Sequence, residues 1–315
     1  MQQYIGDNSG RSYRVQEVTE ACSKKFGGAL LFVATGQTAL SGTPQLLKLK
    51  ARFRIEVELS DQDVDTVIRQ IILAKKPEHS AQLTAVLTQH SGEISRHLVG
   101  TRIEAIVEDQ SWLVADYPLL PVRRRFWEKV LRAVDQAGTS GQLRNQLKVV
   151  YEATKVTADT PLGTVVGADF IFNQLATAFL QTGVLPREIY DNINDLRDGT
   201  DDGNLKARLC ALVFLIGKLP REAGVDLGIR ATPDVLADLL IEDLTTGSAQ
   251  LRQRIPALLQ NLVDRVQLMQ VGTEFRLQTR ESSAWDGEYR KRLAALVNEP
   301  QRIRHLRKIP ILLSD

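Results

Sequence analysis

A polar turn after the first long apolar run is the chain's clearest candidate for ligand chemistry. Residues 29–34 (ALLFVA) are predicted to form a buried strand, because Gly27-Gly28 stops the preceding helix. The strand leads into residues 35–38 (TGQT), which include Thr35 and Gln37. Open α/β sheets place ligand-contacting groups at the carboxyl ends of their strands. The turn therefore either contacts a ligand or only caps the strand.

A phosphate-binding loop is not found in the 315 residues. Gly217-Lys218 is the one suggestive pair, but Leu212 stands where the pattern GxxxxGK[ST] needs its first glycine, and Leu219 replaces the Ser/Thr. Phosphate affinity in P-loop proteins comes from that loop's backbone N–H groups, its lysine and a bound Mg²⁺. Tight nucleotide binding by these residues alone is not expected.

Histidines, cysteines and clustered acids give no catalytic or metal-binding pattern. The four histidines are scattered without an HExxH motif, and Cys22 and Cys210 lie far apart without a CxxC motif. Asp61, Asp63 and Asp65 fall at a predicted helix N-terminus, where acids favour the helix dipole. Neither a hydrolase site nor a metal site is predicted.

The composition is typical of a soluble protein of two or three domains. The chain is 43% hydrophobic, and 40 Lys+Arg against 38 Asp+Glu leave a net charge of +2, too small to recruit nucleic acid or membrane globally. The apolar run at residues 209–219 is too short to cross a bilayer, and the first residues lack a signal-peptide pattern. We expect a cytoplasmic protein with no membrane partner.

The elements that must position the candidate residues are mostly helices. A helix over 12–26 precedes the first strand, and a second helix-then-strand unit ends in a strand over 55–59. An amphipathic helix follows from Ser60, with Val64, Val67, Ile68, Ile71 and Ile72 inward. Further helices are predicted near residues 80–98, 121–137, 140–154, 168–181, 186–197 and 204–217.

The segment 232–280 has the pattern of a winged helix. Thr232 caps one predicted helix, Ser248 caps a second, and Pro256 begins a third. Two alternating strands then flank Gly272-Thr273, a turn with glycine first that suits type II′. The alternative is an incidental helical hairpin with an edge ribbon.

Seven stretches of this chain share their residues with a known ATPase family. They are residues 2–8 (QQYIGDN), 13–17 (YRVQE), 32–40 (FVATGQTAL), 58–76, 118–121 (PLLP), 125–127 (RFW) and 141–147 (GQLRNQL). In them the chain resembles the P-loop ATPase of bacteriophage-exclusion (BREX) defence systems, the BrxC/PglY type. The resemblance implies an α/β remnant of an AAA+-type P-loop domain, then a mainly α-helical lid and linker, then a winged-helix domain.

The resemblance also implies cofactors and partners. Family members are longer, and their P-loop and acidic Walker B strand precede the stretch that matches residues 2–8. We therefore expect a fragment of an oligomerising ATPase, inactive alone, whose completed form binds ATP and Mg²⁺. The implied partners are other BREX-system proteins and further copies of the chain.

Particular residues take roles from the same resemblance. Thr35, with Gln37 beside it, matches the sensor-one position, and Arg52 matches an arginine finger, with Arg54 as the alternative. Arg144 matches a sensor-two-like position that contacts phosphate. The competing interpretations are a solvated Arg52 at a basic helix end and an Arg144 paired with a neighbouring acid.

The implied domain organisation has five parts. They are the AAA+ remnant (1–76), a helical lid (77–155), a helical linker (156–230), the winged helix (231–280) and a basic tail (281–315).

A second interpretation is a binding module without ATPase activity that docks protein or DNA. Six arginines balance six acids between residues 230 and 280, so the winged helix alone is a poor DNA binder. Between 286 and 308, seven basic residues against three acidic ones give +4, which favours the tail for any DNA contact. The nucleic-acid candidates are Arg265, Arg290, Lys291, Arg292, Arg304, Arg307 and Lys308.

Overall fold

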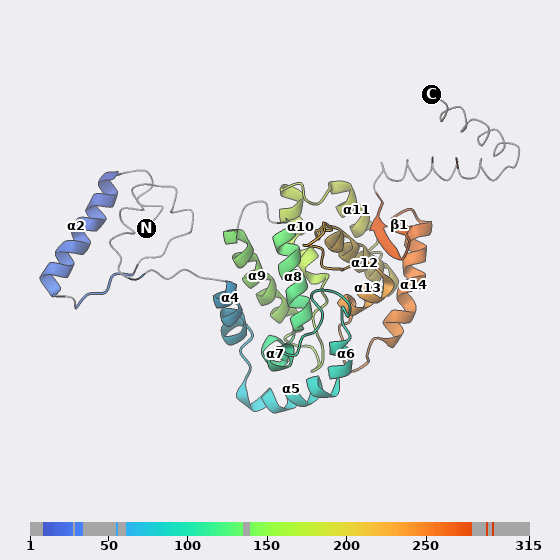
Figure 1. Ribbon diagram of the computed structural model, residues 1–315, viewed down its shortest axis with the longest axis horizontal. Coiled ribbons are helices and arrows are strands. Elements are labelled where there is room, and N and C mark those ends of the chain that lie inside the picture. Colours follow the sequence, from blue (N-terminus) through green and yellow to red (C-terminus); the bar gives the residue numbers. More distant parts are fainter. Residues whose placement is uncertain are drawn as a thin grey trace, which may run out of the picture. The chain divides into compact units, whose positions relative to one another are not determined.

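The computed structural model describes residues 9–27, 29–33, 55, 61–134, 139–278, 288 and 292. The chain divides into two compact units. One consists of Met1–Val67 and Asp135–Asn145, and the other of Ile68–Val134 and Gln146–Asp315 (Figure 1).

The first unit contains the predicted N-terminal helix but not the predicted strand that follows it. Helix α2 spans Ser9–Phe26 and ends with Lys24 and Lys25 in its last turn, where cations favour the helix dipole. Residues 29–33 are not a strand, and Leu31 is 85% exposed. A strand needs a hydrogen-bonded neighbour, and no strand pairs with these residues in the described part of the unit.

A π-helical turn changes the face that the next segment buries. Helix α4 spans Asp61–Val67 and the π-helix η2 spans Ile68–Ile72. The Leu73 N–H donates to the Ile68 carbonyl (2.8 Å), five residues back, so the wider turn shifts the following side chains by one position. Ile68 and Leu73 are buried, whereas Val67 and Ile71, predicted to face inward, are exposed.

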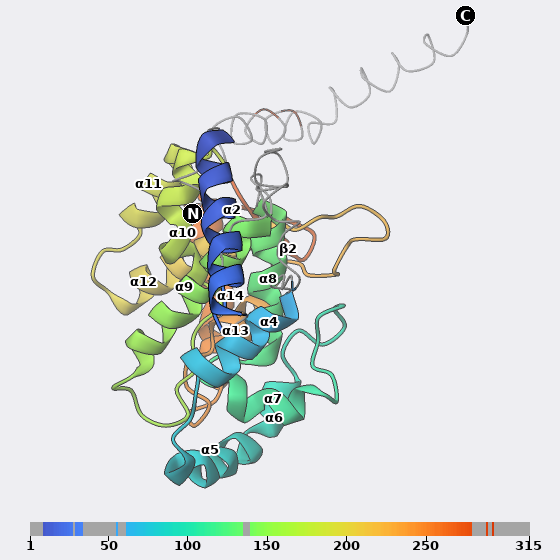
Figure 2. The ribbon, with the colours of Figure 1, turned by 90° about the vertical axis from the view of Figure 1, so that its left-hand side faces the viewer.

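Most of the predicted helices of the second unit are confirmed. Helix α7 (Asp109–Asp116) was not predicted, and α9 begins in the first unit. Helices α5, α6 and α7 lie together at one end in Figures 1 and 2. The bounds of the others are α5 Pro77–Gln89, α6 Ser91–Ser95, α8 Pro121–Val134, α9 Thr139–Thr157, α10 Phe170–Gln181, α11 Arg187–Asp195 and α12 Asp201–Gly217.

Helix α12 is the buried centre of this unit. The Thr200 hydroxyl caps it by accepting from the Gly203 N–H (3.0 Å), and Asp201 and Asp202 occupy the first turn, where acids favour the dipole. From Leu209 to Ile216 every side chain is buried. A helix that is apolar on all sides must be covered by others, so α12 organises the elements around it.

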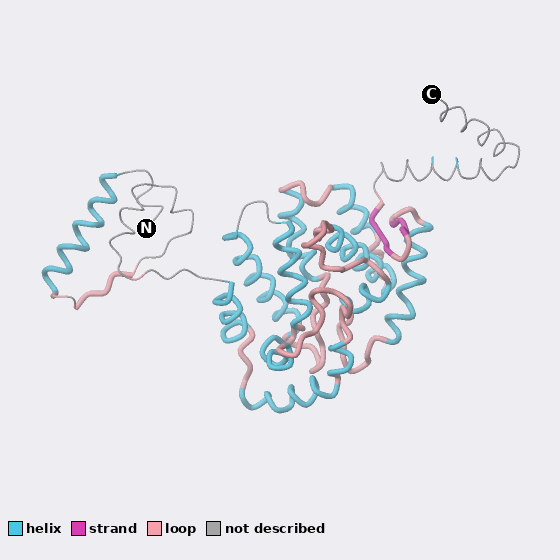
Figure 3. Tube along the Cα trace, viewed as in Figure 1, coloured by secondary structure: helices cyan, strands magenta, loops and turns pink. Residues whose placement is uncertain are grey.

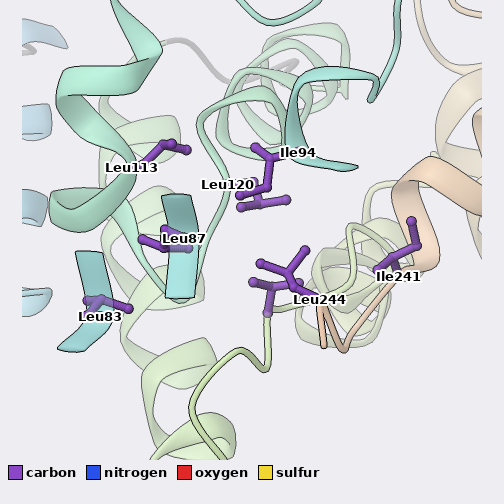
Figure 4. Close-up of a cluster of buried hydrophobic side chains, with 8 residues drawn as sticks. Leu83, Leu87, Ile94, Leu113, Leu120, Ile241 and Leu244 are labelled. Carbon is purple, nitrogen blue, oxygen red and sulfur yellow. The ribbon is translucent and has the colours of Figure 1, made fainter. Parts of the chain in front are cut away.

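One hydrophobic core joins segments far apart in the sequence. It contains residues from the predicted lid, linker and winged helix (Figure 4). Its buried members are Leu83, Leu87, Ile94, Leu113, Leu120, Val165, Ile241 and Leu244.

The C-terminal part has two helices and a hairpin where three helices were predicted. Helix α13 (Pro233–Leu240) is capped by Thr232 as expected, and strands β1 (Leu268–Val271) and β2 (Glu274–Leu277) pair antiparallel (Figure 3). The predicted second and third helices are one helix, α14 (Ala249–Asp264). Pro256 lies inside it and starts no new helix. An interior proline removes one backbone donor and crowds the carbonyl four residues back, and burial of Ile255, Leu258 and Leu259 offsets this cost.

Candidate functional site

The predicted nucleotide-site residues are not brought together in the described part of the chain. Thr35, Gln37, Arg52 and Arg54 lie outside the described residues. Arg144 belongs to α9, but its side chain is also outside the description. The ATP-site assignments therefore stay predictions.

Two of the nucleic-acid candidates are described. Arg265 is the C-cap of α14 and is exposed, and none of the described carboxylates pairs with it. Arg292 donates to Glu288 (2.9 Å), one helical turn away. The other candidates, Arg290, Lys291, Arg304, Arg307 and Lys308, lie outside the described residues.

Helix α12 packs against α13, α14 and β2, and so forms a three-helix group with the hairpin on one side. The Phe275 N–H donates to the Ala231 carbonyl (2.9 Å), which fixes the segment before α13 beside strand β2. The Gln278 N–H donates to the Gln267 carbonyl (3.0 Å) and closes the base of the hairpin. These bonds place α14 and the hairpin on a rigid support.

Ion pairs hold the outer surface of this group together. Arg254 of α14 pairs with Asp202 of α12 (2.6 Å). Glu274 of β2 accepts from Arg221 (2.9 Å) and pairs with Arg230 (3.0 Å). Arg221, Arg230 and Arg254 are thus already neutralised by acids of the same unit.

A buried polar cluster links α6 to α13 and α14. Arg252 pairs with Asp238 and donates to the Ser248 hydroxyl (3.0 Å), and the second Asp238 oxygen accepts from the Leu98 N–H (2.9 Å). His97, 1% exposed, lies with Nε2 3.6 Å from Glu93 Oε1, too far for a hydrogen bond. Burial lowers the pKa of His97, so this imidazole is neutral at pH 7.

Arg123 of α8 is a fully buried cation whose described acceptors are backbone carbonyls. It donates to the carbonyls of Val166 (2.6 Å) and Asp238 (3.0 Å). Burial lowers the pKa of Arg123 to about 10, which still leaves it charged at pH 7. The side chain therefore connects α8, the loop before α10 and α13 from inside.

A cleft of about 420 Å³ opens between the end of α9, the start of α10 and the first turns of α12. On one wall, Arg208 donates two hydrogen bonds to Asp169 (2.8 and 3.0 Å) and two to Glu242 (2.7 Å each). Gly167 permits this arrangement, since a Cβ there would lie 2.5 Å from an Asp169 oxygen. Arg197 also lines the cleft and donates to Asn173 (2.8 Å).

Comparison with known proteins gives no family. No protein-family model matches the chain, and no solved structure matches it.

The described residues contain neither a metal-binding cluster nor a membrane-spanning helix. No group of three or more His, Cys, Asp or Glu side chains is placed to hold a metal ion. Among the helices described, none combines the length and apolarity needed to span a membrane.

The cleft residues were missed by the sequence prediction for a physical reason. Arg197, Arg208 and Glu242 are up to 45 residues apart and follow no fixed-spacing motif, so only the packing of α11 and α13 against α12 brings them together. The available signal was weak. Arg208 is a charged residue directly before the buried apolar run Leu209–Ile216, and such a residue needs a partner.

Proposed function

We propose that residues 201–278 form a winged-helix-type module that docks onto protein. The order of elements supports this proposal: helix α12, helices α13 and α14, then the β1–β2 hairpin. The hydrogen bond from the Phe275 N–H to the Ala231 carbonyl places residue 231 beside strand β2, where a winged helix has a third strand next to its hairpin. In this arrangement α12 takes the place of the first helix, which the sequence prediction had put at α13.

The ion pairs of the arginines favour a protein over DNA as the partner of this module. Residues 201–278 contain seven arginines, and all except Arg265 pair with carboxylates in the described structure. Duplex DNA is held mainly by arginines and lysines that neutralise phosphates. Before these arginines could bind phosphates, their ion pairs with carboxylates would have to break. A protein surface is therefore a better partner than DNA.

Exposed apolar side chains near the hairpin support the same partner. Val266, between α14 and β1, is 52% exposed, and Val271 at the hairpin turn is 44% exposed. Apolar side chains beside charged pairs are typical of protein interfaces, where a buried centre is surrounded by a polar rim. The salt dependence of duplex DNA binding separates the two kinds of partner and is the experiment that tests this proposal.

We further propose that this module belongs to an oligomerising ATPase of the kind that the sequence resembles. In that proposal ATP and Mg²⁺ bind only in the completed protein, and other BREX-system proteins are the docking partners. The support is the set of seven sequence stretches that resemble this family.

The chain alone is expected neither to hydrolyse ATP nor to bind it tightly. The loop, lysine and metal ligands that bind phosphate are missing, and the remaining arginines give few contacts. Phosphate release and calorimetry with ATP and Mg²⁺ measure both properties. Turnover of about 1 s⁻¹ or faster, or a Kd below about 1 μM, would show that the proposal is wrong.

A further inference from the structure

We propose that the cleft between α9, α10 and α12 binds a monoanionic carboxylate that carries an apolar group. This site goes beyond the docking function and lies on a different part of the unit from the hairpin. Its volume of about 420 Å³ is within the usual range for small-ligand sites, roughly 300–1,000 Å³.

Arg197 is the cation that makes the cleft selective for an anion. It donates to the neutral side-chain oxygen of Asn173 (2.8 Å), and no carboxylate pairs with it in the described part of the chain. A guanidinium presents five N–H donors in a planar fork that matches the two oxygens of a carboxylate. Arg197 therefore has donors left for a ligand.

Arg208 cannot play the same part. All four of its hydrogen bonds go to Asp169 and Glu242, which satisfy the guanidinium from two sides. Asp169 and Glu242 together carry two negative charges, of which Arg208 balances one, so Arg197 makes these four side chains neutral overall. A carboxylate can pair with the Arg197 guanidinium, whereas a dianion such as a phosphate monoester would be repelled about twice as strongly by the two acids.

The remaining walls fit the apolar part of the ligand. Val156, Val165 and Phe170 line the cleft, and Val156 is 63% exposed. Covering such surface is favourable, by roughly 25 cal/mol per Å² of apolar area removed from water. Asn173 and Asn204 supply side-chain amides at the cleft for the ligand's other polar atoms.

The test uses four probes of defined chemistry and the full chain. 3-Phenylpropionate carries the proposed groups, 3-phenylpropionamide is its neutral analogue, and phenyl phosphate offers a dianion. N-acetylphenylalanine presents the same carboxylate as it occurs at a polypeptide end. Binding is followed through the NMR signals of the Asn173 and Asn204 side-chain amides.

We expect 3-phenylpropionate to bind with a Kd of about 1–10 mM and the amide at least about tenfold more weakly, because a charge-assisted hydrogen bond is lost. Arg197→Gln should remove this difference while leaving the folded spectrum intact, since Arg197 is exposed. Arg187→Gln, at an exposed arginine of α11 paired with Asp191, should leave it unchanged.

Three outcomes overturn the proposal: equal binding of acid and amide, tighter binding of phenyl phosphate, and a difference that survives Arg197→Gln. Preference for N-acetylphenylalanine over 3-phenylpropionate would support a polypeptide end as the source of the carboxylate. The reverse preference would support a free small molecule. None of these results depends on whether the module binds DNA. The proposal for the cleft can therefore be wrong while the docking function is right, and the reverse.

Discussion

Arg123→Ala is expected to lower the free energy of unfolding by about 3–5 kcal/mol, the range for emptying a large buried position. The side chain is fully buried, so its removal opens a cavity between α8 and α13. It also leaves the carbonyls of Val166 and Asp238 without their donor, and a buried unsatisfied group costs about 1–3 kcal/mol. Urea denaturation followed by circular dichroism measures the loss.

Arg132→Ala on the same helix is the matched control. Arg132 is about half exposed and pairs with Glu128 one turn away (2.8 Å). Surface pairs of this kind contribute about 0.3–0.5 kcal/mol. If both variants lost the same small amount, the buried role of Arg123 would be wrong.

Asp238→Ala should cost a similar amount, about 3–5 kcal/mol, because it removes one partner of a buried ion pair. Arg252, 17% exposed at its side chain, would keep its charge without its main acceptor. The Leu98 N–H would also lose its acceptor, in a residue whose positive φ of 56° already needs support. Thermal and urea unfolding give the change in stability.

Asp234→Ala separates this effect from helix electrostatics. Both aspartates belong to α13, but the Asp234 side chain is 90% exposed and 3.7 Å from Arg252. Its loss should cost about 1 kcal/mol or less, mostly through the helix dipole. Equal losses for the two variants would contradict the importance of the buried pair.

Helices were predictable where local signals agree. Thr232-Pro233 set the start of α13, since caps act within a few residues, and the helix predicted near residues 204–217 lies within α12. Pro256 misled the prediction, because a proline favours the first turn of a helix but does not require it. The π-turn at Ile68–Ile72 left no local signal that distinguishes it from an ordinary helical turn.

Ion pairs and the cleft were not predictable in the same way. The sequence predicts only that the module is neutral overall. The structure shows which charges pair, for example Arg254 with Asp202 and Arg221 with Glu274. Those partners are 52 and 53 residues apart, so their pairing follows from tertiary packing. Thr35, Gln37 and Arg52 fall outside the described part of the chain, as does the side chain of Arg144, so their roles stay predictions.

The salt dependence of duplex DNA binding tests the central claim, docking onto protein, most directly. Titrations over a salt series compare the full chain, a chain without residues 286–315, and Arg265→Ala. With about four phosphate contacts from the tail, the log–log slope should be roughly −3 to −4, and deletion of the tail should abolish binding. Arg265→Ala should change little, because one arginine adds about one contact. If deletion left affinity and slope intact while Arg265→Ala removed both, the module would be a DNA reader and the docking proposal would be contradicted.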